Sequence, residues 1–219
     1  MIIGLVGFAG SGKGTIADIL VNEHDFSKIA FADSVKDSVA AIFGWPRHLL
    51  EGDTDESRKF RETKDEFWSD KLNCSFTPRQ ALQLMGTEAG REVFHNDVWI
   101  HSVERRIKYK TEWEFENNFV ISDVRFANEV EAIRKWGGFI VRVARGREPE
   151  WFDTAFRHNV AGEYQMHVKY PEVHVSEWAW IGQQFDYQIS NNGTVPMLEA
   201  DVKHMLRVMT GPVIMNEVR

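Results

Sequence analysis

A run of glycines around one lysine lies near the start of the chain, at residues 7–15. Glycine lets the backbone adopt positive φ and approach an anion closely, and Lys13 adds a charge that can reach phosphate oxygens. The apolar residues 2–6 before it have the length of a buried parallel strand, and apolar residues recur at helical spacing after it. The amides that open such a helix also favour phosphate. This order predicts a phosphate-binding loop, with a glycine-rich turn that binds nothing as the weaker alternative.

Charged and aromatic residues in the middle of the chain could bind a second substrate. Arg79 and Arg91 can hold a phosphate through their guanidinium groups, and Trp99 can stack on a base from the start of a predicted helix. A core position is the alternative for Trp99. Lys36 lies in the first turn of another predicted helix, where the dipole disfavours a cation. It is therefore either a solvated surface charge or a ligand for an anion.

Further polar residues follow two apolar segments. Asp123 ends the predicted strand 118–123, and Arg125 comes just after it. In open α/β sheets ligands bind beyond the carboxyl ends of the strands, so both residues are expected at the site. A helix cap is the alternative for Asp123. Arg145 follows the predicted strand 139–144, where arginines often form a lid over phosphates.

The alternation of strands and helices that positions these residues predicts an α/β fold. Strands are expected at 2–6, 27–32, 118–123, 139–144 and 186–190, and helices from 13, from 33 or 34, and at 77–85, 98–110, 127–136 and 195–209. Two insertions, about 45–76 and 145–183, interrupt the pattern. The first is expected to contain a short helix or a flap, with Arg58 and Arg61 as phosphate ligands if it closes. In the second, His167, His174 and Glu177 fit no standard zinc spacing.

The amino-acid composition excludes several classes of protein to which this chain could belong. The 219 residues, 43% of them hydrophobic, suffice for one α/β domain with insertions. A formal charge of -7 and a pI near 5.6 argue against direct, sequence-independent binding of nucleic acid. The single cysteine, Cys74, excludes an internal disulfide and is expected to be a small apolar filler. With neither a membrane-spanning run nor a signal peptide in view, we expect a soluble, cytoplasmic protein.

Gly14 stands where the usual phosphate loop has Ser or Thr, and Thr15 follows it, as in nucleoside monophosphate kinases. More widely, the chain up to about Met209 resembles the phage deoxynucleoside monophosphate kinase family. The similar segments are GSGKGT at 10–15, FADSVK at 31–36, PRQALQLMGT at 78–87, DVW at 97–99, ISDVR at 121–125, NE at 128–129 and NNGT at 191–194. Their order and spacing make the resemblance specific.

The resemblance implies a single-domain, three-layer P-loop kinase fold over 1–219, in which helices flank a parallel sheet. It implies transfer of the ATP γ-phosphate to a deoxynucleoside monophosphate (dNMP), with Mg2+ held by Thr15 and, through water, Asp123. The residues assigned to ATP are Gly10, Ser11, Gly12, Lys13, Gly14, Thr15 and Arg145. Those assigned to the dNMP are Lys36, Arg79, Gln83, Thr87, Arg91, Trp99, Asp123, Arg125 and Glu129. Lys13, Arg79, Asp123 and Arg125 are assigned to catalysis.

Phosphoryl transfer between two polyanions requires positioning and a local positive cleft, even in an acidic protein. The attacking phosphate oxygen is already ionised, so no strong general base is needed, and Asp123 is expected to organise Mg2+-bound water or the arginines. One alternative is a P-loop kinase of another small phosphorylated metabolite, and another is a non-catalytic nucleotide-binding regulator. The accepted bases, the range of donors and the oligomeric state stay open, with a homodimer among the alternatives.

Overall fold

The computed structural model describes residues 1–211, which form two compact units. One is the sheet unit, made of Met1–Lys28 and the described residues from Glu116 onward. The other is the helical unit, the continuous stretch Ile29–Phe115. Within residues 1–211, no helix is long and apolar enough to cross a membrane.

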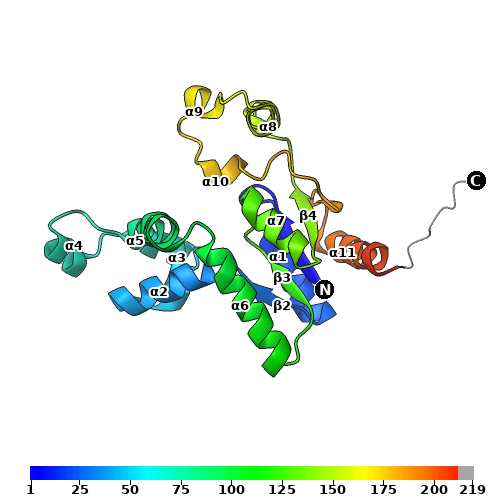
Figure 1. Ribbon diagram of the computed structural model, residues 1–219, viewed down its shortest axis with the longest axis horizontal. Helices are drawn as coiled ribbons and strands as arrows, with labels where there is room; N and C mark the ends of the chain where they lie inside the picture. Colours follow the sequence, from blue (N-terminus) through cyan, green and yellow to red (C-terminus); the bar gives the residue numbers. More distant parts are fainter. Residues whose placement is uncertain (212–219) are drawn as a thin grey trace, which may run out of the picture. The chain divides into compact units, whose positions relative to one another are not determined.

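Five strands form one sheet (Figure 1). They are β1 (Ile2–Val6), β2 (Ser27–Ile29), β3 (Phe119–Ile121), β4 (Phe139–Ala144) and β5 (Tyr187–Ser190). Their spatial order is β2-β3-β1-β4-β5, and β1 runs parallel to both β3 and β4, as β4 does to β5. The expected strand positions are thus confirmed, with β2 and β3 shorter than predicted. The phosphate loop leaves the end of the central, buried strand.

Helices cover both faces of the sheet. The helices of the sheet unit are α1 (Lys13–His24), α7 (Ala127–Lys135), α8 (Phe152–Ala161), α9 (Met166–Lys169), α10 (Val175–Trp178) and α11 (Val195–Thr210). Helices α1 and α11 share a core with Ile3 and Leu5 of β1, whereas Ile133 of α7 packs over Gly4. Because neighbouring residues of a strand point to opposite faces, α7 lies on the other side of the sheet from α1 and α11. The expected three-layer α/β fold with a parallel sheet is confirmed.

The helical unit contains the first insertion. Its elements are α2 (Asp33–Phe43), η1 (Arg47–Leu50), α3 (Asp55–Glu62), α4 (Glu66–Leu72), α5 (Pro78–Leu84), the π-helical η2 (Met85–Phe94) and α6 (Val98–Trp113). Val39, Trp45, Leu50, Phe76 and Ala81 form its buried cluster. The insertion therefore contains several short helices and contributes Trp45, Leu50 and Phe76 to a core of its own.

Some helix ends differ from the prediction. Thr77 caps α5 as expected, in a capping box with Gln80, but the chain does not stop at Gly86 and continues as η2. There the Trp99 indole packs on Gly90 and donates its N–H to the Gly86 carbonyl at 2.8 Å. Helix α2 begins at Asp33 as predicted, and the Asp33 carboxylate accepts the Ala30 N–H at 2.9 Å.

Gly90→Ala should destabilise the protein, because a Cβ there would clash with the Trp99 indole and lie 2.7 Å from the Met85 carbonyl oxygen. Overpacking of this kind costs about 1–3 kcal/mol. Gly86→Ala is the matched control, since its Cβ would meet only Val35, at 3.8 Å. Thermal unfolding followed by circular dichroism should show a lower Tm for Gly90→Ala alone. Equal Tm values for the two variants would contradict the packing of Trp99 on Gly90.

Candidate active site

The loop between β1 and α1 needs glycine at two positions for steric reasons. Gly7, Gly10 and Gly12 have φ values of 146°, 76° and 103°. A Cβ on Gly7 would clash with the carbonyl oxygen of Val143, and one on Gly12 would clash with the side-chain amide of Asn191. Gly14 was expected to share the positive φ, but it lies in the first turn of α1. The loop backbone is therefore tightly enclosed on the side that faces the protein.

Asn191, at the end of β5, clamps the loop from that side. Its Nδ2 donates to the Ser11 carbonyl at 2.9 Å, and its own N–H donates to the Ala144 carbonyl at 2.8 Å. The next residue, Asn192, accepts the Gly146 N–H through its side-chain oxygen at 2.8 Å. The two asparagines thus connect the phosphate loop, β4 and the start of the second insertion. In the sequence, Asn191 is part of the NNGT segment of the family resemblance, but no role at the loop was assigned to it.

Lys13 lies folded into the loop, with Nζ donating to the carbonyls of Gly7 at 2.7 Å and Phe8 at 2.9 Å. Burial, the largest cause, and the charge of Arg125 together lower the pKa of Lys13 from 10.5 to about 8, although the charges of Glu177 and Asp123 oppose the shift. Two cations and two carboxylates therefore interact in one region of the sheet unit. The two cations could bind an anionic ligand, but in this structure the two carboxylates balance their charge.

The outer side of the loop is open. Gly10, Gly14 and Thr15 are exposed, and Arg145 Nη1 donates to the Gly10 carbonyl at 3.4 Å, which keeps this arginine at the loop. The Ser11 hydroxyl is buried and has no hydrogen-bond partner among residues 1–211. The Thr15 hydroxyl and the Asp123 carboxylate, which acts on Lys13 electrostatically, are oxygen ligands of the kind that Mg2+ prefers. The residue types at the loop are thus compatible with a bound nucleotide and Mg2+.

Glu129 has a different environment from the one expected. Its side chain is only 2% exposed, and its carboxylate accepts the N–H groups of Arg125 at 2.8 Å and Phe126 at 3.2 Å. A buried carboxylate at a helix start is stabilised by such amides, as in a capping box. The resemblance assigns Glu129 to the dNMP, but in this structure its carboxylate is buried and accepts two backbone N–H groups. Glu129 instead fixes the backbone that carries Arg125.

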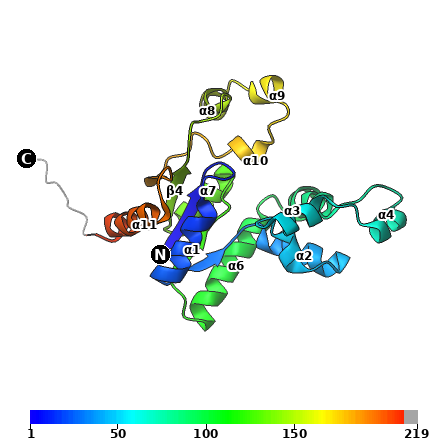
Figure 2. The ribbon, with the colours of Figure 1, turned by 180° about the vertical axis from the view of Figure 1, so that it is seen from behind.

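The second insertion packs directly on the phosphate loop. The Phe8 ring meets Trp180 and Trp151 edge-to-face, at centroid distances of 5.1 and 5.4 Å. Two further residues of this insertion contact Arg125, whose Nη1 lies 3.2 Å from Ser176 Oγ and 3.7 Å from Glu177 Oε1. Figures 1 and 2 show α8, α9 and α10 grouped together within this insertion. The sequence offered no signal for Phe8 or Ser176 as site residues.

The three residues weighed as metal ligands in this insertion have separate partners. His174 shares a hydrogen bond of 2.9 Å with Ser176, and Glu177 pairs with Arg125. The His167 ring packs on the rings of His158 and Trp178. Among residues 1–211, they do not form a metal-binding group.

The remaining predicted substrate residues belong to the helical unit. Lys36 is 15% exposed and pairs with Glu51 at 2.6 Å, so it is not a solvated surface charge. Burial opposes ionisation of Glu51, but hydrogen bonds from Lys36 and Arg47 outweigh this effect and lower the pKa of Glu51.

The other predicted dNMP ligands of the helical unit have varied surroundings. Arg79 pairs with Glu62. Gln83 and Thr87 are exposed, while Arg91 is partly buried and engaged in contacts.

Trp99 was expected to stack on a base, with a core position as the alternative. Its side chain is only 8% exposed, its ring packs on Gly90, and its indole N–H is bonded to the Gly86 carbonyl. The structure therefore places Trp99 in the core of the helical unit, and a base could stack on it only after η2 moved. Gly90, which accommodates the ring, lies nine residues earlier in the sequence.

One group of side chains in the helical unit resembles a metal site. His95, Asp97 and His101 bring one ligand atom each to within 4.8 Å of one another. However, His95 Nδ1 accepts the backbone N–H of Asp97 at 3.0 Å. A metal on Nε2 would leave a proton on Nδ1, where that N–H already donates. The hydrogen bond explains the arrangement as the start of α6, and we assign no metal there.

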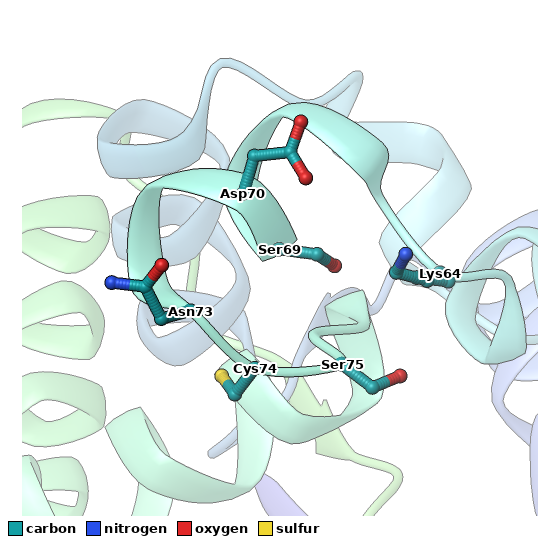
Figure 3. Close-up of a pocket in the computed structure, with 6 residues that line it drawn as sticks. All are labelled: Lys64, Ser69, Asp70, Asn73, Cys74 and Ser75. Carbon is teal, nitrogen blue, oxygen red and sulfur yellow. The ribbon is translucent and has the colours of Figure 1, made fainter.

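A shallow hollow lies beside α4, and Figure 3 shows the residues that line it: Lys64, Ser69, Asp70, Asn73, Cys74 and Ser75. The side chains of Asp70, Asn73 and Lys64 point in different directions, so they do not converge on a ligand (Figure 3). The Ser69 hydroxyl accepts the Phe76 N–H at 3.0 Å. Cys74 is exposed, which corrects its interpretation as an apolar filler.

A scan against models of protein families finds no match. A protein of Acanthamoeba polyphaga mimivirus, named a deoxynucleotide monophosphate kinase, is 32% identical over 155 residues, 66% of this chain and 74% of that protein. A deoxynucleoside-5'-monophosphate kinase of Escherichia phage T5 is 41% identical over 59 residues, 27% of this chain and 22% of that protein. Among solved structures, TT1252 from Thermus thermophilus is 18% identical, with 96% of this chain and 98% of that chain covered and a TM-score of 0.45.

The mimivirus relative is similar over most of its own length, and the present chain has a phosphate loop that contains Lys13. The chain therefore belongs to the deoxynucleotide monophosphate kinase family.

Proposed function

We propose that this kinase transfers the γ-phosphate of ATP to a deoxynucleoside 5'-monophosphate, releasing ADP and a deoxynucleoside diphosphate for DNA precursor synthesis. The family membership is the observation that carries the proposal. The phosphate loop, with Lys13 and Arg125 as neighbouring cations, supports it. For a phage-encoded protein, the place of action would be the host cytoplasm.

In the proposed reaction an oxygen of the acceptor phosphate bonds to the γ-phosphorus, and the bond from that phosphorus to the β-bridging oxygen breaks. Lys13 neutralises charge on the β- and γ-phosphates, and Arg125 holds the acceptor phosphate. Thr15 and, through water, Asp123 would hold Mg2+, which supplies further charge neutralisation. Arg145 covers the donor from the loop side. Lys36, Arg79 and Arg91 of the helical unit are proposed as further acceptor ligands.

A coupled assay of ADP release should test the proposed substrates directly. With ATP as donor, at least one dNMP is expected to be phosphorylated faster than the matching ribonucleotide. The same assay with a dephospho-cofactor or phosphomevalonate is the control for another small-metabolite kinase. If no dNMP reacts, the proposed acceptor is wrong, whatever the affinity for ATP.

Lys13→Met should abolish turnover while the protein stays folded, because the removed charge acts on the transferring phosphoryl group. Loss of a comparable transition-state donor lowers kcat by about 100- to 1000-fold. Lys28→Met is the matched control, since this lysine is exposed and pairs only with Asp18 among the described residues. Steady-state rates and thermal melts of both variants are needed. A Lys13→Met enzyme with near-normal kcat would contradict the loop assignment.

ATP affinity should decrease as the pH rises through about 8, the lowered pKa of Lys13. Above it the free enzyme holds a neutral amine and must take up a proton to bind phosphate, so the affinity should fall by up to about tenfold per pH unit. Without ATP, the unfolded chain binds more protons between pH 8 and 10.5, so this group makes stability rise with pH there. Calorimetric titrations and melts should show both trends, and Lys13→Met should show neither.

A further inference from the structure

Arg125 has two partners from the second insertion. Its Nη1 donates to Ser176 Oγ at 3.2 Å and lies 3.7 Å from Glu177 Oε1. The side chains of Arg125 and Glu177 are 52% and 36% exposed, so both remain in contact with solvent. Ser176 is itself oriented by His174, whose Nδ1 lies 2.9 Å from its hydroxyl. A phosphate that reaches this guanidinium must therefore compete with a carboxylate.

The backbone that carries these partners is firmly held. Trp178 and Trp180 are buried, and the Trp180 indole N–H donates to the Glu177 carbonyl at 2.9 Å. Asn159 Nδ2 donates to the Trp178 carbonyl, also at 2.9 Å. Trp180 in turn packs against Phe8 of the phosphate loop. The half-exposed Glu177 side chain thus extends from a backbone that is attached to the loop itself.

Glu177 also acts on Lys13, since its charge opposes the fall in the Lys13 pKa that burial and Arg125 produce. Its carboxylate is therefore a counter-charge for both cations. A substrate phosphate would be a second anion for the same pair. Because like charges repel, the carboxylate and the phosphate cannot both be favoured there.

We propose that Ser176 and Glu177 are positioning residues that hold Arg125 beside the phosphate loop, and that Glu177 is exchanged for a substrate phosphate when the substrate binds. The inference rests on the proposed function, because it names a step in substrate binding at the same site. An exposed ion pair is worth only about 0–1 kcal/mol. A phosphate carries more charge, and it can accept two parallel guanidinium bonds where Glu177 makes one contact at 3.7 Å, so it can replace this carboxylate.

The test compares Glu177→Gln with Glu172→Gln, which removes an exposed carboxylate from the same insertion. Calorimetric titrations with ATP and, separately, with each dNMP identify the phosphate concerned. Glu177→Gln should tighten binding of at least one of them by roughly two- to fivefold, the effect of an exposed ion pair. The corresponding KM should fall by the same factor with kcat unchanged, since the lost contact competes only in the free enzyme. Glu172→Gln should change neither quantity.

A double-mutant cycle with Arg125→Gln shows whether the effect passes through the guanidinium. In the Arg125→Gln background, Glu177→Gln should no longer tighten binding. Ser176→Ala, which changes no charge and leaves the competing carboxylate in place, should not tighten binding. An unchanged or weaker affinity for Glu177→Gln, an equal gain for Glu172→Gln, or a gain that persists with Arg125→Gln would each overturn the exchange.

The two proposals fail in different ways. If no dNMP is phosphorylated, the proposed function fails, and the ATP titrations still decide whether Glu177 is exchanged. If Glu177→Gln tightens ATP and no dNMP, the exchange stands, but Arg125 serves the donor and not the acceptor.

Discussion

The phosphate loop of the sheet unit is organised around one partly buried positive charge. The Lys13 ammonium is held by the carbonyls of Gly7 and Phe8, in a turn that uses three glycines with positive φ. That turn depends on β1, which β3 and β4 hold on either side, and on Asn191, whose amide fills the space beside Gly12. A phosphate that binds this ammonium must therefore compete with two carbonyls that already accept its hydrogen bonds.

The net charge of the whole chain does not predict the charged side chains around the phosphate loop. The chain has a formal charge of -7, yet two cations and two carboxylates interact around the loop. Glu177 comes from an insertion, as do the aromatic rings that meet Phe8. The insertion therefore contributes both packing and charge to the site. The composition of this insertion, polar and aromatic without a clear hydrophobic period, does not by itself indicate a role at the site.

The parts that could be predicted from the sequence depend on local patterns. The apolar run of β1, the glycines after it and the bounds of β4 all follow from neighbouring residues. Trp99 could not be placed, because a tryptophan at a helix start suits both stacking and a core, and Gly90 decides between them. Glu129 could have been recognised, since a Glu in the first turn often closes a capping box. Glu177 could not, because its partner Arg125 lies 52 residues earlier.

The position of β1 in the sheet has a consequence for how the chain folds as it is synthesised. The two strands that pair with β1 begin at Phe119 and Phe139. More than a hundred further residues must therefore be synthesised before β1 can pair. At synthesis rates of roughly 5–20 residues per second, synthesis of these residues takes on the order of ten seconds. The helical unit is continuous in sequence and emerges complete during that time. The phosphate-binding residues are thus synthesised well before the strands that hold β1 in the sheet.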